Sequence, residues 1–134
     1  MGGEKSTDIV AGAPRQTHSD LAVFSGGPEL FEDQDPVFRW PIIMGGNAFE
    51  VITSLSKPSP VAFQVTLHRY TPSNPTAGQS VHTYTVAAGA WVDYETINVD
   101  FERGQQISPS VHLLDDLGDD EPGEGLLIVV RVAA

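Results

Sequence analysis

The sequence contains no cysteine and few basic residues. Without cysteine the chain can form no disulfide, no thiolate metal site and no cysteine nucleophile. Its 18 acidic residues outnumber its 7 lysines and arginines, so the formal net charge is -11. A surface of that sign repels the phosphates of nucleic acid and the headgroups of anionic lipids. We therefore expect neither nucleic acid nor a membrane as a partner.

Long apolar runs and familiar catalytic frames are also missing from the sequence. No stretch reaches the roughly 18 consecutive apolar residues that indicate a membrane helix, and the first residues lack the basic and apolar regions of a signal peptide. There is no Gly-x-Ser-x-Gly elbow and no glycine-rich phosphate loop. We expect a protein without an export signal that is not an enzyme, has no catalytic residues and needs no cofactor.

The composition changes at residue 36. Residues 1–36 carry clusters of glycine and proline and show no sustained period of 2 or 3.6, which predicts an extended N-terminal arm. Four of its residues are too apolar for a purely solubilising tail and too interrupted by glycine and proline to build a core. We expect them to be partner-contact residues, and we expect the rest of the chain to fold without the arm. These candidates are Val23, Phe24, Leu30 and Phe31.

Residues 37–134 have the pattern of an all-β domain, with short apolar or alternating runs separated by turn residues. Val61, Phe63, Val65 and Leu67 alternate with other residues, as do Ile97, Val99 and Phe101, so each run predicts a strand with one buried face. The last run is apolar on both faces and should lie centrally in a sheet. The expected strands are 37–43, 48–55, 61–70, 80–87, 91–101, 107–113 and 126–133, with long loops at 71–79 and 114–125. This series predicts a jelly-roll-like antiparallel β-sandwich.

Two groups of residues contain side chains that could bind a metal ion. The segment from Asp115 to Glu124 holds six carboxylates, the oxygen ligands that Ca²⁺ prefers, but it lacks the spacing of an EF-hand loop and is interpreted as a solvated turn. If Tyr70 pairs with Ser80 across the 71–79 loop, His68 lies opposite His82, where two imidazoles could reach one Zn²⁺. No third ligand is apparent. We expect no bound metal.

Four aromatic residues could instead form a platform for sugars, which stack on exposed aromatic faces. They are Phe38, Trp40, Trp91 and Tyr94. Aromatic side chains in small β domains lie more often in the core. Because Trp91 and Tyr94 have opposite parity on a regular strand, at most one of them should face inward.

Residues 61–133 resemble small jelly-roll structural proteins of tailed-phage virions. In those domains a "V-x-A-G" turn precedes a "W-V" strand, then "V-x-F-x-x-G-D-x-I", and a terminal strand follows an acidic or glycine-rich loop. Here Gly89, Trp91-Val92 and the Val99 to Gly104 segment fit this pattern, as does the strand from Leu126 to Val132. The chain departs from the pattern at Gln105, where the family often has Asp.

The resemblance implies a non-enzymatic virion protein of a bacteriophage, made in the host cytoplasm and located on the capsid surface. The favoured hypothesis is a homotrimeric capsid decoration, or cement, protein that binds the outer capsid surface through its arm and β domain. Its partner would be the major capsid protein or another virion protein. The alternative is a carbohydrate-binding receptor-recognition module of a phage tail or fibre tip. A small hydrolase would need an acid/base cleft for which the sequence offers no residues.

The absence of a complete ligand set makes a prediction about metal removal. Addition of EDTA should leave the melting temperature nearly unchanged, because neither the acidic segment nor the two histidines can hold an ion. Thermal unfolding with and without the chelator tests this. A fall well beyond a few degrees would contradict it and identify Asp115, Asp116, Asp119 and Asp120 as ligands.

Overall fold

A computed structural model describes residues 18–25, 40–41 and 45–133, with side chains described from residue 45 onward. Among these residues there is no helix long and apolar enough to cross a membrane. The strands are β2 (His18–Ser25), β3 (Trp40–Pro41), β4 (Gly46–Ser54), β5 (Phe63–Thr71), β6 (Asn74–Val86), β7 (Val92–Phe101), β8 (Gln106–Leu113) and β9 (Leu127–Ala133).

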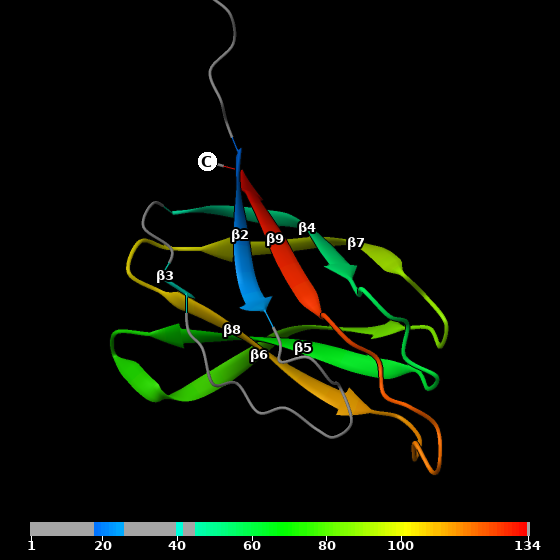
Figure 1. Ribbon diagram of the computed structural model, residues 1–134. Helices are drawn as coiled ribbons and strands as arrows, with labels where there is room; N and C mark the ends of the chain where they lie inside the picture. Colours follow the sequence, from blue (N-terminus) through cyan, green and yellow to red (C-terminus); the bar gives the residue numbers. More distant parts are fainter. Residues whose placement is uncertain (1–17, 26–39, 42–44, 134) are drawn as a thin grey trace, which may run out of the picture.

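The strands form two four-stranded antiparallel sheets that pack face to face (Figure 1). The order is β2-β9-β4-β7 in one sheet and β3-β8-β5-β6 in the other. Along the chain, consecutive strands alternate between the sheets except at the β5–β6 hairpin. This is the strand order of a jelly roll. The all-β sandwich expected from the sequence is therefore confirmed.

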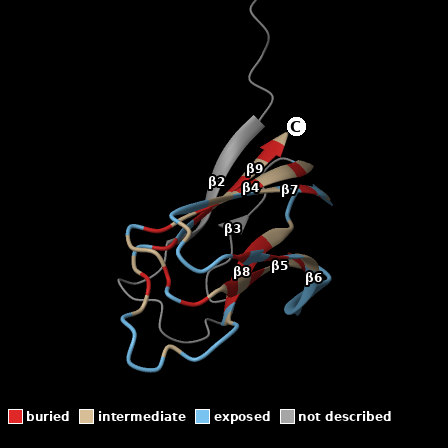
Figure 2. Cartoon of the chain, turned by 90° about the vertical axis from the view of Figure 1, so that its right-hand side faces the viewer, coloured by how far each residue is buried: buried red, intermediate tan, exposed pale blue. Residues whose placement is uncertain are grey.

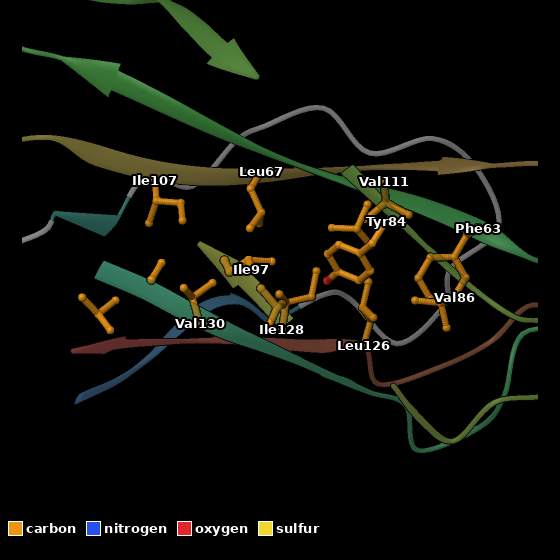
Figure 3. Packing of buried hydrophobic residues seen from close by; sticks show 14 of the residues in the cluster. Phe63, Leu67, Tyr84, Val86, Ile97, Ile107, Val111, Leu126, Ile128 and Val130 are labelled. Atoms are coloured by element: carbon orange, nitrogen blue, oxygen red, sulfur yellow. The ribbon is translucent and has the colours of Figure 1, made fainter. Parts of the chain in front are cut away.

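The core lies between the two sheets and is built from the alternating faces of their strands (Figure 3). Phe63, Val65 and Leu67 are fully buried on β5, as their period of two predicts. On β7, Ile97 and Phe101 are buried, and Val99 is partly buried against the same cluster. The inward phase assigned from the sequence is correct for both strands.

Strand β9 occupies a central position, hydrogen-bonded to β2 on one side and to β4 on the other. Its inward residues Ile128, Val130 and Val132 are buried in the core. Its outward residues Leu127 and Val129 are covered less completely. A strand that is apolar on both faces lies inside its sheet, as expected.

Part of the expected N-terminal arm belongs to the sandwich. Residues 18–25 form β2, which pairs with β9 from His18 opposite Ala133 to Ser25 opposite Leu127. The interpretation of 1–36 as an arm outside the β domain is therefore wrong for this segment. The physical reason is that backbone pairing with a strand as regular as β9 needs no continuous apolar period in the added strand. Residues 1–17 and 26–36 lie outside the described residues.

The expected long loop at 71–79 is also wrong. Strand β5 ends at Thr71 and β6 begins at Asn74, so the turn is short and the hairpin continues beyond the core (Figure 2). The residues of β6 from Asn74 to Ser80 are all exposed. Turn residues such as Pro75 and Gly78 suggested a loop, but Asn74 pairs with Thr71 and Gln79 pairs with Arg69, and the residues between them form an irregularity in the β5–β6 pairing.

The position of β2 predicts the outcome of two truncations. Deletion of residues 1–25 should lower the melting temperature, because it removes the strand that pairs with one edge of β9. Deletion of residues 1–17 should leave the melting temperature close to that of the full chain, because it keeps the whole β2–β9 pairing. Thermal unfolding followed by circular dichroism distinguishes the two. Equal melting temperatures for both truncated chains would show that β2 contributes nothing to stability.

Candidate binding surface

Three loops meet at one end of the sandwich, on the right-hand side of Figure 1. They are the β4–β5 loop (55–62), the β6–β7 loop (87–91) and the β8–β9 loop (114–126), and together they are called the loop end. Backbone hydrogen bonds join them: Leu55 N donates to Trp91 O at 2.9 Å, and Ser56 N donates to Glu124 O at 2.9 Å. The β4–β5 loop therefore fixes the positions of the other two.

Glycine permits the close approach of the β8–β9 loop to the β4–β5 loop. Gly125 has φ +67°, a conformation that other residues rarely adopt, and a Cβ at this position would collide with the Ser56 hydroxyl. The loop end is thus a packed surface that depends on a particular backbone conformation.

Trp91 and Tyr94 are the exposed aromatic residues of this region, with 61% and 66% of their surfaces accessible. Both point away from the core, which agrees with the expectation that at most one would face inward. Of the other two aromatic candidates, Phe38 lies outside the described residues and Trp40 is described only as part of β3. The possible aromatic platform is therefore reduced to Trp91 and Tyr94.

The outer face of the β2-β9-β4-β7 sheet adds apolar residues to these aromatic side chains. Ile52 on β4 pairs with Tyr94 on one side and Val129 on the other, and the neighbouring residue on that face, Ser54, pairs with Val92 and Leu127. Since residues in register on one face are neighbours, these side chains form one surface. It is called the outer patch: Ile52, Val92, Tyr94, Leu127 and Val129. The exposed Trp91 lies next to Val92 in the β6–β7 loop, outside this register. The sequence pattern does not single out Ile52, Leu127 or Val129 as neighbours, because only the strand order brings them together.

The acidic segment of the β8–β9 loop lies on the same end of the molecule. Lys57 forms ion pairs with Glu121 and Glu124. The Lys57 ammonium lowers the pKa of the exposed Glu121 carboxyl. Asp115, Asp116, Asp119 and Asp120 are exposed, as a solvated turn should be. In the described ranges, no three His, Asp or Glu side chains converge as ligands for a metal ion.

The predicted opposition of His68 and His82 is wrong. Irregularities in the β5–β6 pairing shift the register, so that His68 pairs with Ser80 and His82 pairs with Leu67. Adjacent positions on a strand face opposite sides, so the two imidazoles separate. His68 Nε2 lies 2.9 Å from Ser110 Oγ on β8, whereas His82 Nε2 lies 2.9 Å from Glu95 Oε2 on β7. These two histidines do not form a common metal site.

Strands β6 and β7 face each other across the edge of the sandwich through a polar cluster. His82 on β6 pairs with Glu95 on β7. Tyr84 OH, also on β6, lies 2.7 Å from Thr53 Oγ1 on β4, and both side chains are buried. Asp93 belongs to the same inward face of β7, and its Oδ2 is shielded from solvent without a hydrogen-bond partner among the described residues. The period of Ile97, Val99 and Phe101, extended backward, would have placed Asp93 and Glu95 inward.

The electrostatics of this cluster disfavour negative charge. Burial raises the pKa of Asp93, and the nearby Glu95 carboxylate raises it further. Burial also raises the pKa of the Tyr84 hydroxyl, although its hydrogen bond to Thr53 acts in the opposite direction. Because Asp93 Oδ2 is shielded from solvent, this side of the carboxyl offers no access to a substrate. The cluster joins the two sheets.

The partner-contact candidates in the first 36 residues separate into two groups. Val23 and Phe24 lie on β2, where Phe24 pairs with Ile128 of β9. Leu30 and Phe31 lie outside the described residues. Phe24 is thus paired within the sandwich, whereas Val23 lies at the irregularity of the pairing between Ala22 and Phe24.

Comparisons with known proteins give no family. No family model matches the sequence, and no curated protein matches it. Among solved structures, the chain is similar to one titled "Structure of infectious bursal disease virus Gx strain", with a TM-score of 0.46 and 8% identity, over 87% of this chain and 32% of that one. It is also similar to "Crystal structure of PirA", with a TM-score of 0.42 and 10% identity, over 90% of this chain and 98% of that one. The chain therefore spans about a third of the viral chain's length.

The raised pKa of Asp93 makes stability depend on pH. The native state keeps a proton on Asp93 at pH values where the unfolded chain has lost it, so the free energy of unfolding should fall as pH rises from the ordinary Asp pKa, about 3.9, through the raised native value. The Asp93→Asn variant removes the buried charge and its repulsion with Glu95. Above this pH range the variant should have a higher free energy of unfolding than the wild type. Within the range its free energy of unfolding should depend less on pH.

Denaturant unfolding at a series of pH values measures the effect. Asp119→Asn is the matched control, because it removes the same charge from an exposed position. Parallel pH profiles for the wild type and Asp93→Asn would contradict the prediction.

Proposed function

We propose that the chain is a non-enzymatic structural protein of a virion, and specifically a decoration protein that binds the outer capsid surface as a homotrimer. The observation that carries this proposal is the outer patch. An exposed tyrosine beside aliphatic residues on a rigid sheet, with an exposed tryptophan in the adjoining loop, is typical of a protein contact surface. The sequence resemblance to phage jelly-roll proteins supplies the virion as the setting.

The observed fold revises the role expected of the first 36 residues. Strand β2 is held within the sandwich, so it positions the flanking segments and does not itself extend toward a partner. In this proposal the β domain contributes the outer patch, and Leu30 and Phe31 remain candidate contacts for the capsid protein.

Attachment to capsids tests the proposal. Purified wild-type and variant chains are mixed with capsids that lack the protein, and occupancy is measured after sedimentation. Trp91→Ser and Tyr94→Ser should each weaken attachment about tenfold or more, which corresponds to about 1.4 kcal/mol. The control Asn74→Ser changes an exposed residue on β6, near the hairpin turn, and should bind like the wild type. Full occupancy by both aromatic variants would reject the outer patch as the attachment surface.

A second candidate function is carbohydrate recognition at a tail or fibre tip. The specific observation in its favour is the exposure of both Trp91 and Tyr94, since sugars stack on accessible aromatic faces. Glycan-array binding that is lost in Trp91→Ser, together with no attachment of the wild type to capsids, would select this function over the first.

A further inference from the structure

Strand β6 ends one sheet of the sandwich, and its last residues form an unpaired edge. β6 lies beside β5 at the end of the order β3-β8-β5-β6, and among the described residues it pairs with no other strand (Figure 2). From His82 to Val86 this pairing is regular, because Leu67 to Phe63 follow one another opposite these residues without a bulge. Alternate backbone N–H and C=O groups of this part of β6 therefore point away from β5 and can pair with an added strand.

The sequence around this edge contains no Asp, Glu, Lys or Arg. None occurs between Arg69 and Asp93, although the whole chain has 18 acidic and 7 basic residues. Charged side chains, proline and bulges are the usual features that keep an edge strand from pairing with other chains. Pro75 and the irregularities of the β5–β6 pairing all lie before His82, in the exposed first half of β6. Residues 82–86 therefore lack these protections.

Carboxylates of the other sheet lie next to this edge. β7 ends its own sheet in the described part of the chain, and its inward face carries Asp93 and Glu95. Glu95 Oε2 lies 2.9 Å from His82 Nε2, and a third of the Glu95 side chain (33%) remains accessible. No lysine or arginine of the described residues forms an ion pair with Asp93 or Glu95. A strand added to β6 would direct alternate side chains toward β7 and these carboxylates.

Charge complementarity selects among the possible occupants of the β6 edge. Lysine or arginine at alternate positions of an added strand would face Glu95 and gain attraction, whereas acidic side chains there would be repelled. Two copies of the chain joined through their β6 strands would bring a second Asp93 and Glu95 to the same place, where like charges repel. Hydroxyl-bearing side chains suit the other face of the added strand, because the exposed Thr83 and Thr85 lie on that face of β6.

We infer that residues 82–86 of β6 bind an extended segment of another protein as an added β-strand, with lysine or arginine at the positions that face β7. Backbone hydrogen bonds supply the affinity, and Glu95 supplies the preference for a basic segment. This inference goes beyond the proposed function, because it assigns a second contact surface that the outer patch does not include.

Synthetic peptides test the backbone and the charge requirements separately. The probe is a short peptide in which Thr and Lys alternate, titrated into the full chain while backbone amide resonances are followed by nuclear magnetic resonance. One comparison peptide has the same sequence with every amide N-methylated, which keeps the charges and removes the N–H donors. The other alternates Thr and Glu. The Thr-Lys peptide should bind at least about tenfold more tightly than either, and equal binding of either comparison peptide would overturn the inference.

Hydrogen exchange locates the bound peptide on the protein. A saturating concentration of the Thr-Lys peptide should slow amide exchange in residues 82–86 several-fold or more, because outward N–H groups of β6 become hydrogen-bonded. Protection that appears in β7 or β2 and spares residues 82–86 would place the peptide at another edge and overturn the inference.

A matched pair of variants separates the local charge from the net charge. Glu95→Gln keeps the shape of the side chain and should bind the Thr-Lys peptide several-fold more weakly, with a smaller dependence on salt. The control Asp100→Asn removes the same charge from an exposed position at the far end of β7 and should bind like the wild type. An equal loss of binding in the two variants, or no loss in Glu95→Gln, would contradict the assigned role of Glu95.

Two further measurements identify the occupant. Concentration-dependent self-association in sedimentation velocity, accompanied by protection of residues 82–86 without peptide, would overturn the inference, because a second copy would then occupy the edge. Trp91→Ser and Tyr94→Ser, the variants that test the decoration role, should bind the Thr-Lys peptide like the wild type. The failure of either proposal is therefore distinguishable from the failure of the other.

Discussion

Strand β4 and the loop that follows it are the constraint on which most of this structure depends. β4 pairs with β7 along one edge and with β9 along the other, so it sets the register of both. Its inward Val51 and Thr53 are fully buried, and its outward Ile52 lies at the centre of the outer patch. The next residues, Leu55 and Ser56, then fix the two loops beside the patch. Core, patch and loop end are therefore positioned by one continuous segment.

The two sheets are joined differently in the centre and at the β6–β7 edge. In the centre, apolar side chains of the two sheets meet, as Leu67 of one sheet and Ile97 and Ile128 of the other do in Figure 3. At the edge, the buried hydrogen bond between Thr53 and Tyr84 and the His82–Glu95 pair cross from one sheet to the other. Directional contacts of this kind favour one relative placement of the sheets, because a displaced tyrosine hydroxyl would be buried without a partner.

The sequence predicts the fold well wherever one face of a strand is buried. The period of two in β5 and β7 gives both the strands and their inward residues, because burial on one side demands that alternation. It fails for β2, which is defined by its backbone pairing with β9, and for the exposed first half of β6, because neither has a clear apolar face in the sequence. The exposure of Trp91 and Tyr94 limits the possible aromatic platform to two residues, but the rest of the outer patch requires the strand order. Residues 52, 92 and 129 are distant in sequence and meet only after β9 and β7 take their places on either side of β4.

The inward direction of Asp93 and Glu95 affects whether β7 can pair with a strand from a second copy of the chain. Strand β7 forms one edge of its sheet within the described part of the chain, and such an edge offers unpaired backbone groups to any extended chain. Carboxylates that point into the sandwich from an edge strand oppose the addition of another strand, since a continued sheet would enclose their charge between two layers. The same strand carries Val92 and Tyr94 on its other face. The outward side chains of β7 thus form an apolar binding surface on the face of the sheet. The inward carboxylates of the same strand oppose the addition of strands at its edge, and so oppose fibril growth.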